Sequence, residues 1–301
     1  MTEPPLSVSV VIPCGRPDHI GDCVESVWAA KGARDVEVVV VTPDAEFIPS
    51  GLRERVVIVP VDELYAPGRM RNIGVTRATG DVLVFLDDDC RCPEGWIDEM
   101  VDALVFRSEV GMVGCRVCAV PPTFWGRTAD FALFGAYQTT RSGYQHLGSA
   151  AIAIDKKCFV DADGFDESLL ASEDWDLSLR VEASGARCWF AADVASIGHH
   201  HDRRSFTGIV RNAWRSGFRS GLVVQERHSE QMTGLARAGL WFGRRGLYVF
   251  MVIPYASVLS AAMFLTAVRQ TFSALGMLPV LFISQCAYHL GVARRLREAR
   301  G

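Results

Sequence analysis

Continuous apolar runs alternate with amphipathic segments over the first third of the chain. These runs are rich in β-branched residues and lie at residues 7–13, 36–41, 56–61 and 81–86. Helical patterns follow the first and the third run, at residues 19–31 and 69–78. Fully apolar strands that alternate with helices are typical of a parallel sheet covered on both faces. The pattern therefore predicts an α/β fold with a mostly parallel, twisted sheet between helices.

Three adjacent carboxylates, Asp87, Asp88 and Asp89, follow directly after the run that ends at Leu86. Ligands bind open parallel sheets outside the carboxyl ends of the strands, so this position favours a binding site over a solvated acidic turn. The three charges repel one another, which costs stability without a cation or a basic partner. On an extended chain Asp87 and Asp89 would lie on the same side. That arrangement suits one Mg²⁺ or Mn²⁺ ion bridged to diphosphate oxygens.

A second acidic cluster, Glu173-Asp174-Trp175-Asp176, opens a helix that the pattern predicts over residues 173–184. Acidic residues in a first turn stabilise a helix through its dipole. The alternative is a carboxylate that acts as general base for an acceptor hydroxyl, with the tryptophan shaping a sugar-sized pocket beside it. Between the two clusters, residues 121–146 are rich in aromatic residues and glycine and show no clean period, which is typical of a substrate-facing loop region.

Three histidines at positions 199–201 follow a short apolar segment and precede Arg203. One interpretation is a solvated polar turn. On an extended chain, however, His199 and His201 would share one face, and either imidazole could bind the same metal ion. The guanidinium groups of Arg203 and Arg204 could then neutralise a leaving diphosphate.

Five motifs occur in order along the first two-thirds of the chain. They are VVIP at 10–13, RMRNIG at 69–74, GDVLVFLDDD at 80–89, GFDE at 164–167 and EDWDLSLR at 173–180. In this order they resemble the motifs of family 2 glycosyltransferases of the GT-A fold, and the resemblance covers residues 8–216. It implies inverting transfer of a sugar from a nucleotide-diphosphate donor with the help of a divalent metal ion.

The resemblance also implies roles at the positions that match the family's motifs. Asp87 and Asp89 match the carboxylates that hold the metal ion and the donor diphosphate. Asp174 matches the proposed base, with Glu173 and Trp175 beside it on the acceptor side. The donor-side candidates are Pro13, Arg16, Asp44, Arg71, Asp87, Asp88 and Arg203. The metal-ligand candidates are Asp87, Asp89, His199 and His201.

Two departures from the family's pattern leave the nucleotide open. The family usually has an aspartate directly after the second strand, where it reads the base. Here Thr42-Pro43 stand in that place, and Asp44 comes two residues later. The segment Cys14-Gly15-Arg16-Pro17 also replaces the usual turn after the first strand. The identities of the nucleotide, the sugar and the acceptor therefore stay open.

The C-terminal part contains two long uncharged stretches. Residues 246–268 and 271–293 each hold 23 residues without Asp, Glu, Lys or Arg, enough to rise about 34 Å as a helix and span a bilayer core. Arginines flank the pair on both sides, and only Arg269 lies between them. The positive-inside rule then predicts a hairpin in the plasma or inner membrane, with the catalytic domain on the cytoplasmic face. Two buried or interfacial helices are the alternative, which the short Arg269-Gln270 connection favours.

Composition narrows the remaining possibilities. The formal net charge of −4 argues against nucleic acid as a partner. The nine cysteines lack zinc-ribbon spacing and most lie in apolar runs, so we expect reduced, buried thiols. The first ten residues lack the charged start and apolar core of a signal peptide, which favours a cytosolic catalytic domain.

The sequence thus predicts a GT-A-like domain at residues 1–235, divided into a nucleotide-sugar and metal half (1–114) and an acceptor half (115–235), and a membrane-associated hairpin at 236–301. The predicted partners are a nucleotide-diphosphate sugar, a saccharide or lipid-linked acceptor, and a membrane. A polyprenyl-phosphate glycosyltransferase is the main alternative, but its acceptor is already ionised and needs no base. A sugar nucleotidyltransferase would need a glycine-rich basic loop near the N-terminus, and a non-catalytic scaffold would have no use for the acidic motifs.

Overall fold

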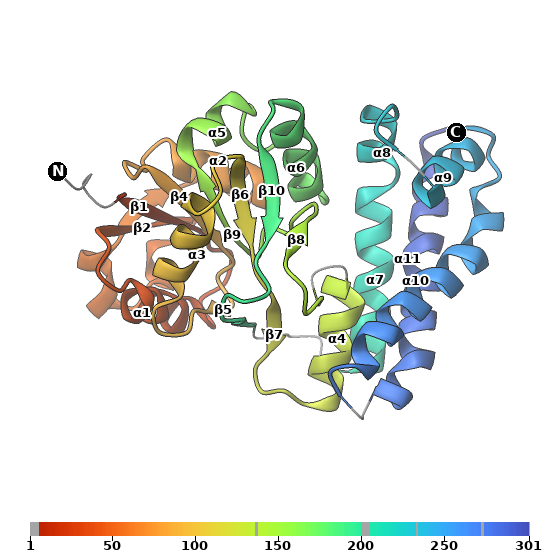
Figure 1. The fold of residues 1–301 in the computed structure, drawn as a ribbon, viewed down its shortest axis with the longest axis horizontal. Helices are drawn as coiled ribbons and strands as arrows, with labels where there is room; N and C mark the ends of the chain where they lie inside the picture. The colour runs from red at the N-terminus through yellow and green to blue at the C-terminus, as the bar shows by residue number, and fades with distance from the viewer. Residues whose placement is uncertain (1–5, 136–137, 200–204, 233, 272–273, 301) are drawn as a thin grey trace. The chain divides into compact units, whose positions relative to one another are not determined.

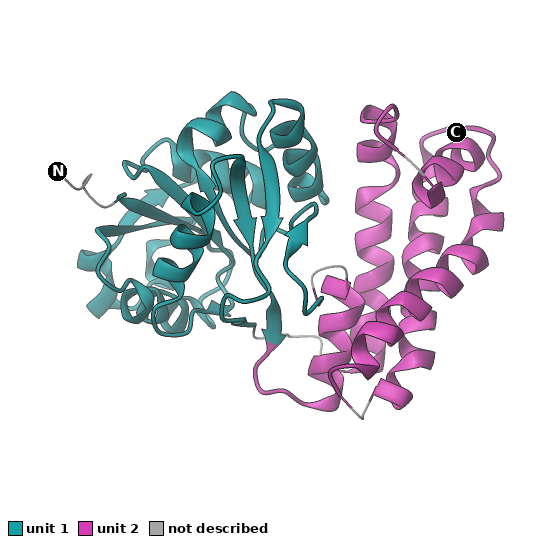
Figure 2. Ribbon diagram, viewed as in Figure 1, with its two compact units in different colours: residues 1–118, 139–200 teal, residues 119–138, 201–301 magenta. Residues whose placement is uncertain are grey.

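The chain folds into two compact units, shown in Figure 2. The computed structural model describes residues 6–135, 138–199, 205–232, 234–271 and 274–300. Unit 1 comprises residues 1–118 and 139–200, and unit 2 comprises residues 119–138 and 201–301. Unit 2 is therefore built from two separate chain segments. The functional boundary expected near residue 235 stays a prediction.

An eight-stranded sheet forms the centre of unit 1 within the described residues, in the order β3-β2-β1-β4-β9-β6-β10-β8 (Figure 1). Its strands are β1 (Val8–Pro13), β2 (Val36–Thr42), β3 (Val57–Pro60), β4 (Val82–Leu86), β6 (Val110–Gly114), β8 (Gly143–Tyr144), β9 (Ala151–Asp155) and β10 (Arg187–Phe190). Strands β1 to β4 pair in parallel, as do β6 and β10. Strand β9 runs antiparallel between β4 and β6, and β8 is antiparallel to β10. The predicted α/β fold with a mostly parallel sheet is confirmed.

Helices pack on this sheet because its central strands are apolar on both faces. The helices of unit 1 are α1 (Ile20–Ala30), α2 (Pro67–Val75), α3 (Trp96–Val105), α5 (Lys156–Asp161) and α6 (Glu173–Ala183), with 3₁₀ turns η1 (Ala45–Phe47) and η2 (Ser50–Arg55). Helix α2 packs on β1 and β2. A Cβ at Gly74 would lie 2.4 Å from Val11 Cγ1 and 2.9 Å from Val41 Cγ2, so glycine allows this close approach. Glycine at this position thus lets α2 pack directly on the two strands.

A small three-stranded sheet in the order β5-β11-β7 adjoins the acidic cluster. Its strands are β5 (Cys90–Arg91), β7 (Val117–Ala119) and β11 (Ile197–His199). Strands β5 and β11 are antiparallel, with His199 opposite Cys90. This pairing brings the first histidine of the 199–201 run to the residues that follow Asp89.

Helices make up most of the described residues of unit 2. Its elements are α4 (Phe124–Phe134), α7 (Phe206–Ser220), α8 (Val223–Arg227), α9 (Gly234–Arg244), η4 (Tyr248–Met251), α10 (Val252–Val268) and α11 (Ala274–Glu298). Two helical segments, residues 248–268 and 274–298, are long and apolar enough to cross a membrane. Helix α11 packs against both α7 and α10.

The expectation of a loop region at residues 121–146 is wrong in part, because α4 lies within it. The Thr123 side chain caps this helix by accepting a hydrogen bond from the Gly126 N–H at 3.0 Å. Its apolar face is buried in unit 2, where Phe131 clusters with Met277 and Leu281. These contacts are distant in sequence, and a periodicity read from the segment alone could not show them.

Candidate functional site

The acidic cluster forms a tight turn between β4 and β5. The Cys90 N–H donates to the Asp87 carbonyl at 3.0 Å, which closes the turn. The extended backbone assumed for these residues is therefore not found. Asp87 Oδ1 accepts a hydrogen bond from Arg71, whereas Asp89 Oδ1 lies 3.2 Å from His199 Nε2. The turn thus gives the two carboxylates different partners.

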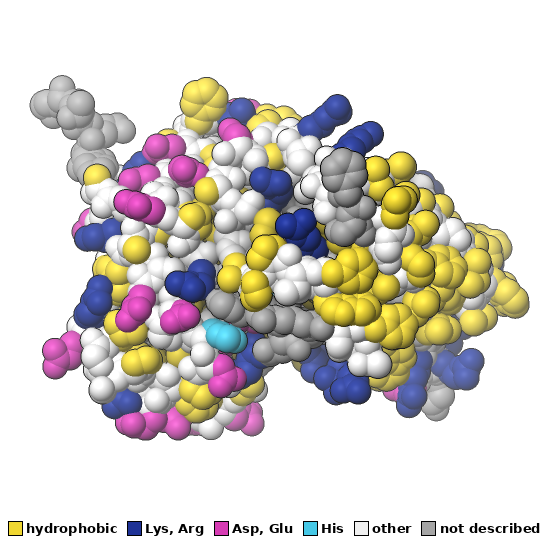
Figure 3. Space-filling view, turned by 90° about the horizontal axis from the view of Figure 1, so that it is seen from below, with side chains coloured by type: hydrophobic (Ala, Val, Ile, Leu, Met, Phe, Trp, Pro, Cys, Tyr) yellow, Lys and Arg dark blue, Asp and Glu magenta, His cyan; other side chains and the backbone are white. Residues whose placement is uncertain are grey.

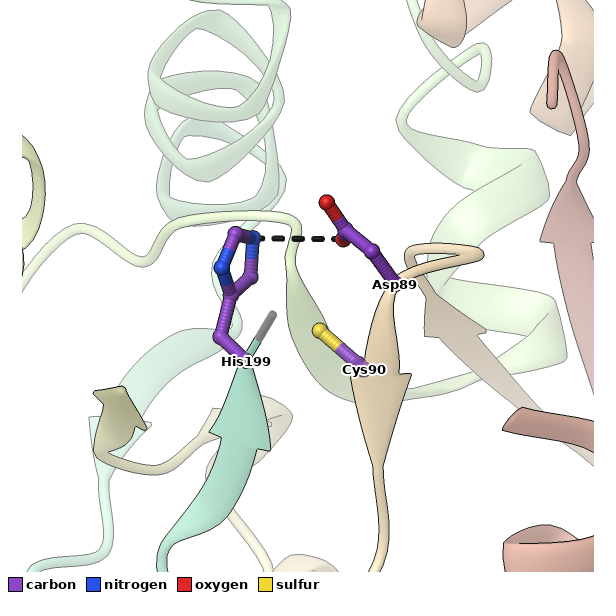
Figure 4. A group of neighbouring side chains, drawn as sticks. All are labelled: Asp89, Cys90 and His199. Atoms are coloured by element: carbon purple, nitrogen blue, oxygen red, sulfur yellow. Dashed lines mark ion pairs between the residues drawn. The ribbon is translucent and has the colours of Figure 1, made fainter. Parts of the chain in front are cut away.

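Asp89, Cys90 and His199 form a candidate metal centre (Figure 4). All three are buried, and one potential ligand atom from each lies within 4.8 Å of the others. Burial alone would raise the pKa of Asp89, but the hydrogen bond and charge of His199 hold it below its ordinary value. Burial raises the pKa of the Cys90 thiol well above its ordinary range. A carboxylate beside an imidazole fits a divalent transition metal such as Mn²⁺, with a protonated thiol as a weak third neighbour.

Arg16 and Gly15 contact the carboxylates of the acidic turn. Arg16 Nη2 lies 3.1 Å from Asp89 Oδ2 and 3.8 Å from Asp88 Oδ1. The Gly15 N–H donates to Asp88 Oδ2 at 3.1 Å. Burial, followed by the charge of Asp89, raises the pKa of Asp88 to about 6. The loop after β1 therefore supplies the positive charge and the N–H donor that the clustered carboxylates require.

Arg71 joins the two acidic motifs. Its side chain is 2% exposed; Nη2 donates to Asp87 Oδ1 at 2.7 Å and Nη1 donates to Glu173 Oε1 at 2.9 Å. Burial opposes its charge, but Asp87 and Glu173 hold the pKa of Arg71 above its ordinary value. Burial raises the pKa of Asp87, and the Arg71 guanidinium opposes that rise. The end of β4 and the start of α6 are thus linked through one buried guanidinium.

Asp174 is held at the start of α6 by two backbone donors. Its Oδ2 accepts from the Ser149 N–H at 3.0 Å, and its Oδ1 accepts from the Trp175 N–H at 2.8 Å. The residue as a whole is half-buried. Burial, followed by the charge of Glu173, raises the pKa of Asp174 to about 6. A carboxylate with this pKa is ionised at neutral pH yet basic enough to accept a proton in a transition state.

The residue before α6 adopts a strained backbone. Ser172 has φ 65° and ψ 19°, a left-handed conformation that is uncommon outside glycine and asparagine. Trp175 then donates from Nε1 to His146 Nδ1 at 3.0 Å, and His146 Nε2 lies 3.5 Å from Glu182. These contacts fix the indole beside Asp174. Backbone strain such as that at Ser172 is concentrated at functional sites.

Comparison with known proteins agrees with this geometry. The family described as "Glycosyltransferase like family 2" matches residues 4–219. The chain belongs to this glycosyltransferase family. The resemblance inferred from the sequence motifs is thereby confirmed.

Individual relatives are more distant. A pre-mycofactocin glycosyltransferase of Mycobacterium tuberculosis (strain H37Rv) is 28% identical over 180 residues, which are 58% of this chain and 38% of that protein. The O-antigen biosynthesis protein RfbC of Myxococcus xanthus is 26% identical over 231 residues, 67% of this chain and 18% of that protein. The chain thus spans well under half the length of both. Among solved structures, the fold is shared by the mannosyltransferase PcManGT of Pyrobaculum calidifontis, solved in complex with GDP-Man and Mn²⁺. Its TM-score is 0.65 at 17% sequence identity, and the match covers 99% of this chain and 89% of that chain.

The other candidate residues named from the sequence are Pro13, Asp44, His201, Arg203 and Arg204. Pro13 ends β1, where its neighbour Cys14 donates from N–H to the Val41 carbonyl at 2.8 Å. Asp44 is exposed and caps η1, accepting from the Glu46 N–H at 2.8 Å. His201, Arg203 and Arg204 lie outside the described residues.

Three residues of the site were missed by sequence reasoning: Ser149, His146 and Cys90. The first two precede β9, which is antiparallel to β4 with Ala151 opposite Leu86. The residues before β9 therefore meet the residues after β4. Recognising β9 as antiparallel would have pointed to them. The position of Cys90 was a signal as well, since it directly follows the three aspartates.

The sequence also predicts reduced, buried thiols. All nine cysteines lie within the described residues and are free thiols, six of them buried.

Proposed function

We propose that this chain is an inverting glycosyltransferase that moves a sugar from a nucleotide-diphosphate donor to an acceptor hydroxyl. The observation that supports it most is the buried guanidinium of Arg71, which joins Asp87 of the acidic turn to Glu173 beside the candidate base. A donor-binding group and a base must act on the same sugar, and this link fixes their separation. Family membership and the similar fold of a mannosyltransferase solved with GDP-Man and Mn²⁺ support the donor class.

On the donor side, Asp89 and His199 would hold the divalent ion, with the Cys90 thiol next to them. When bound, such an ion supplies positive charge that stabilises a departing diphosphate. The imidazole in this set favours Mn²⁺ over Mg²⁺, which prefers oxygen ligands. Arg16 contributes a half-exposed guanidinium at the same place. Besides pairing with Asp89, Arg16 would contact a phosphate oxygen once the donor is bound.

On the acceptor side, Asp174 would take the proton of the attacking hydroxyl. The hydroxyl oxygen forms a bond to the anomeric carbon while the bond from that carbon to the diphosphate oxygen breaks. The electron pair leaves with the diphosphate, and the proton goes to the Asp174 carboxylate. A single displacement of this kind inverts the anomeric carbon. The Ser149 and Trp175 N–H groups orient the carboxylate for this task.

The two apolar helices of unit 2 lead us to propose membrane attachment as well. Their arginine-flanked ends would place the catalytic unit on the cytoplasmic face. A lipid-linked saccharide would then be a suitable acceptor, because its hydroxyl groups are presented at the same surface. The acceptor of a polyprenyl-phosphate transferase would be presented there too, so the chemistry of the acceptor has to be tested directly.

The test uses the purified full-length protein with Mn²⁺ and a panel of UDP- and GDP-sugars. Release of the nucleoside diphosphate is measured with hydroxyl acceptors and with polyprenyl phosphate. Asp174→Asn should lower transfer to a hydroxyl by about 10²-fold or more while leaving donor affinity nearly unchanged. Asp35→Asn, at an exposed position of unit 1, is the matched control. Transfer to polyprenyl phosphate that survives Asp174→Asn would instead establish the phosphate-acceptor alternative.

A further inference from the structure

The outer face of α10 is apolar and exposed. Ile253, Val258, Leu265 and Val268 are each between 47% and 60% exposed, although α10 has no charged residue within its bounds. Four leucine and isoleucine side chains of α11 are exposed as well: Leu275, Leu278, Ile283 and Leu290. Figure 3 shows hydrophobic side chains over much of the surface at its right, where the helices of unit 2 lie. A continuous apolar face of this kind requires an apolar partner.

The charge around this face indicates an anionic lipid surface. Residues 234–301 contain eight arginines and a single acidic residue, Glu298. Helix α9 is amphipathic and presents Trp241, 49% exposed, with the Arg245 guanidinium 3.9 Å from the centroid of its ring. Arginine and tryptophan beside an apolar face are typical of helices that lie in the headgroup region. The surface therefore fits a bilayer leaflet with anionic headgroups.

Helix α7 runs alongside α11 and limits how α11 can enter the membrane. A Cβ at Gly217 would lie 1.9 Å from the Tyr288 carbonyl oxygen, and one at Gly291 would lie 2.3 Å from the Trp214 carbonyl oxygen. Near the start of α7, Ile209 clusters with Val280. The two helices thus run parallel, with their backbones in close contact at Gly217 and Gly291.

The outer side of α7 is strongly basic. Arg211, Arg215 and Arg219 follow one another at four-residue steps, and all three are exposed. If α11 crossed the bilayer with α7 attached, these arginines would enter the hydrocarbon core. An arginine at the centre of a membrane-spanning helix is strongly disfavoured, and arginines tolerated there face a bundle interior or a water-filled cavity.

The turn between α10 and α11 is tied to α4 and the residues that follow it. Arg127 Nη1 donates to Thr271 Oγ1 at 3.2 Å, and Gln270 Nε2 donates to the Gln138 carbonyl at 2.5 Å. Segment 119–138 leaves unit 1 after Cys118 and rejoins it at Thr139. Helix α4 has 11 residues and rises about 16 Å, short of the roughly 30 Å of a bilayer core. The turn is therefore held on the side of the membrane where unit 1 resides.

We propose that α10 and α11 lie along one leaflet, on the side of unit 1, and do not cross the bilayer. Their exposed apolar face would enter the acyl region, and the arginines of α9 and of the C-terminal end would contact anionic headgroups. This proposal rests on the membrane attachment proposed above but not on the transfer reaction. Of the two arrangements that the sequence allows, it selects the interfacial pair over the membrane-spanning hairpin.

The position of the turn can be tested with a lysine label. The chain has three lysines, Lys31, Lys156 and Lys157, all in unit 1. Arg269→Lys adds one at the exposed start of the turn. Inverted membrane vesicles, which expose the cytoplasmic face, are treated with a membrane-impermeant amine reagent and analysed by peptide mass spectrometry. We expect labelling of the new lysine in sealed vesicles to the same extent as Lys157, with no increase when detergent opens them.

Protection of the new lysine in sealed vesicles, followed by labelling in opened ones, would show a spanning hairpin and overturn the proposal. Lys157 reports in each sample that unit 1 faces the reagent, since its side chain is 82% exposed. The readout needs no activity, so an inactive protein would refute the proposed function without affecting this result.

The lipid partner is tested by flotation of the full-length protein with vesicles. Phosphatidylcholine vesicles are compared with vesicles that contain one-third phosphatidylglycerol. The triple substitution of Arg237, Arg244 and Arg245 to Gln should weaken binding to the anionic vesicles by about 10²-fold, with little effect on neutral ones. The same change at three exposed or half-exposed arginines of unit 1, Arg53, Arg77 and Arg91, is the matched control. Equal binding of the wild type to both vesicle types, or to neither, would overturn the proposal.

Discussion

Arg71 and Glu173 are 102 positions apart in the sequence, yet the Arg71 Nη1 donates to Glu173 Oε1 at 2.9 Å in the interior of unit 1. The other end of the same guanidinium binds Asp87. A buried charge of this kind is stable only when its partners are present and ionised. The turn after β4 and the start of α6 are therefore one electrostatic unit, and a substitution in either should change the stability of the other.

Removing Arg71 should destabilise unit 1 strongly. Arg71→Met would leave Asp87 and Glu173 without their shared partner, and breaking a buried pair typically costs about 3–5 kcal/mol. Arg69→Met is the matched control on the same helix, because Arg69 pairs with Glu167 at 3.6 Å across a half-exposed surface. Such pairs are worth about 0–1 kcal/mol. Urea unfolding followed by fluorescence would compare them, and equal midpoints would contradict the coupling.

The sequence predicts the parallel half of the sheet well, because strands β1 to β4 are short and apolar on both faces. It also places Asp87 to Asp89 correctly at the end of β4. The antiparallel strand β9 is different, since its short apolar run, residues 151–154, has the same appearance in either direction. Its direction is set by long-range pairing with β4 and β6. Ser149 and His146 were missed for that reason.

The helical unit was predicted less completely. Two uncharged stretches identify α10 and the first part of α11 from hydropathy alone. What those helices pack against depends on contacts with α4 and α7, which come from other parts of the chain. Helix α7 has polar and charged residues on one side and small residues such as Gly217 on the other. Nothing local in that pattern indicates that Gly217 meets Tyr288, 71 residues later in the sequence.

Transfer should depend on pH through Asp174. Burial and the charge of Glu173 raise its pKa to about 6, so the carboxyl becomes protonated below that pH and cannot accept the acceptor's proton. The rate should therefore fall as pH decreases through 6, by up to about tenfold per unit. The pKa of Asp88 is also about 6, so Asp88→Asn is the control. This variant should keep the fall in rate below pH 6. If the fall in rate below pH 6 disappears in Asp88→Asn but persists in Asp174→Asn, Asp174 is not the base.

Removal of the metal ion should abolish turnover reversibly. We expect EDTA to inactivate the protein and Mn²⁺ to restore it at lower concentration than Mg²⁺, because His199 offers nitrogen beside the Asp89 carboxylate. Asp89→Asn should weaken Mn²⁺ binding, measured by titration calorimetry, and lower turnover by about 10²–10³-fold. Asp22→Asn, at an exposed carboxylate of α1, should change neither quantity. Turnover that survives EDTA would exclude a metal-assisted reaction.

Packing of α7 on α11 should tolerate no side chain at Gly217. A Cβ there would lie 1.9 Å from the Tyr288 carbonyl oxygen, and a backbone atom cannot move aside as the end of a flexible side chain can. Gly217→Ala should therefore separate the two helices and cost about 1–3 kcal/mol or more. Gly51→Ala is the control, because a Cβ at that position meets nothing within 4 Å and restricts the unfolded chain. Thermal unfolding and limited proteolysis at α7 are the measurements. If Gly217→Ala unfolds at the same temperature as Gly51→Ala and resists the protease equally, the two helices are not in the backbone contact described, and the case against a spanning α11 loses one of its supports.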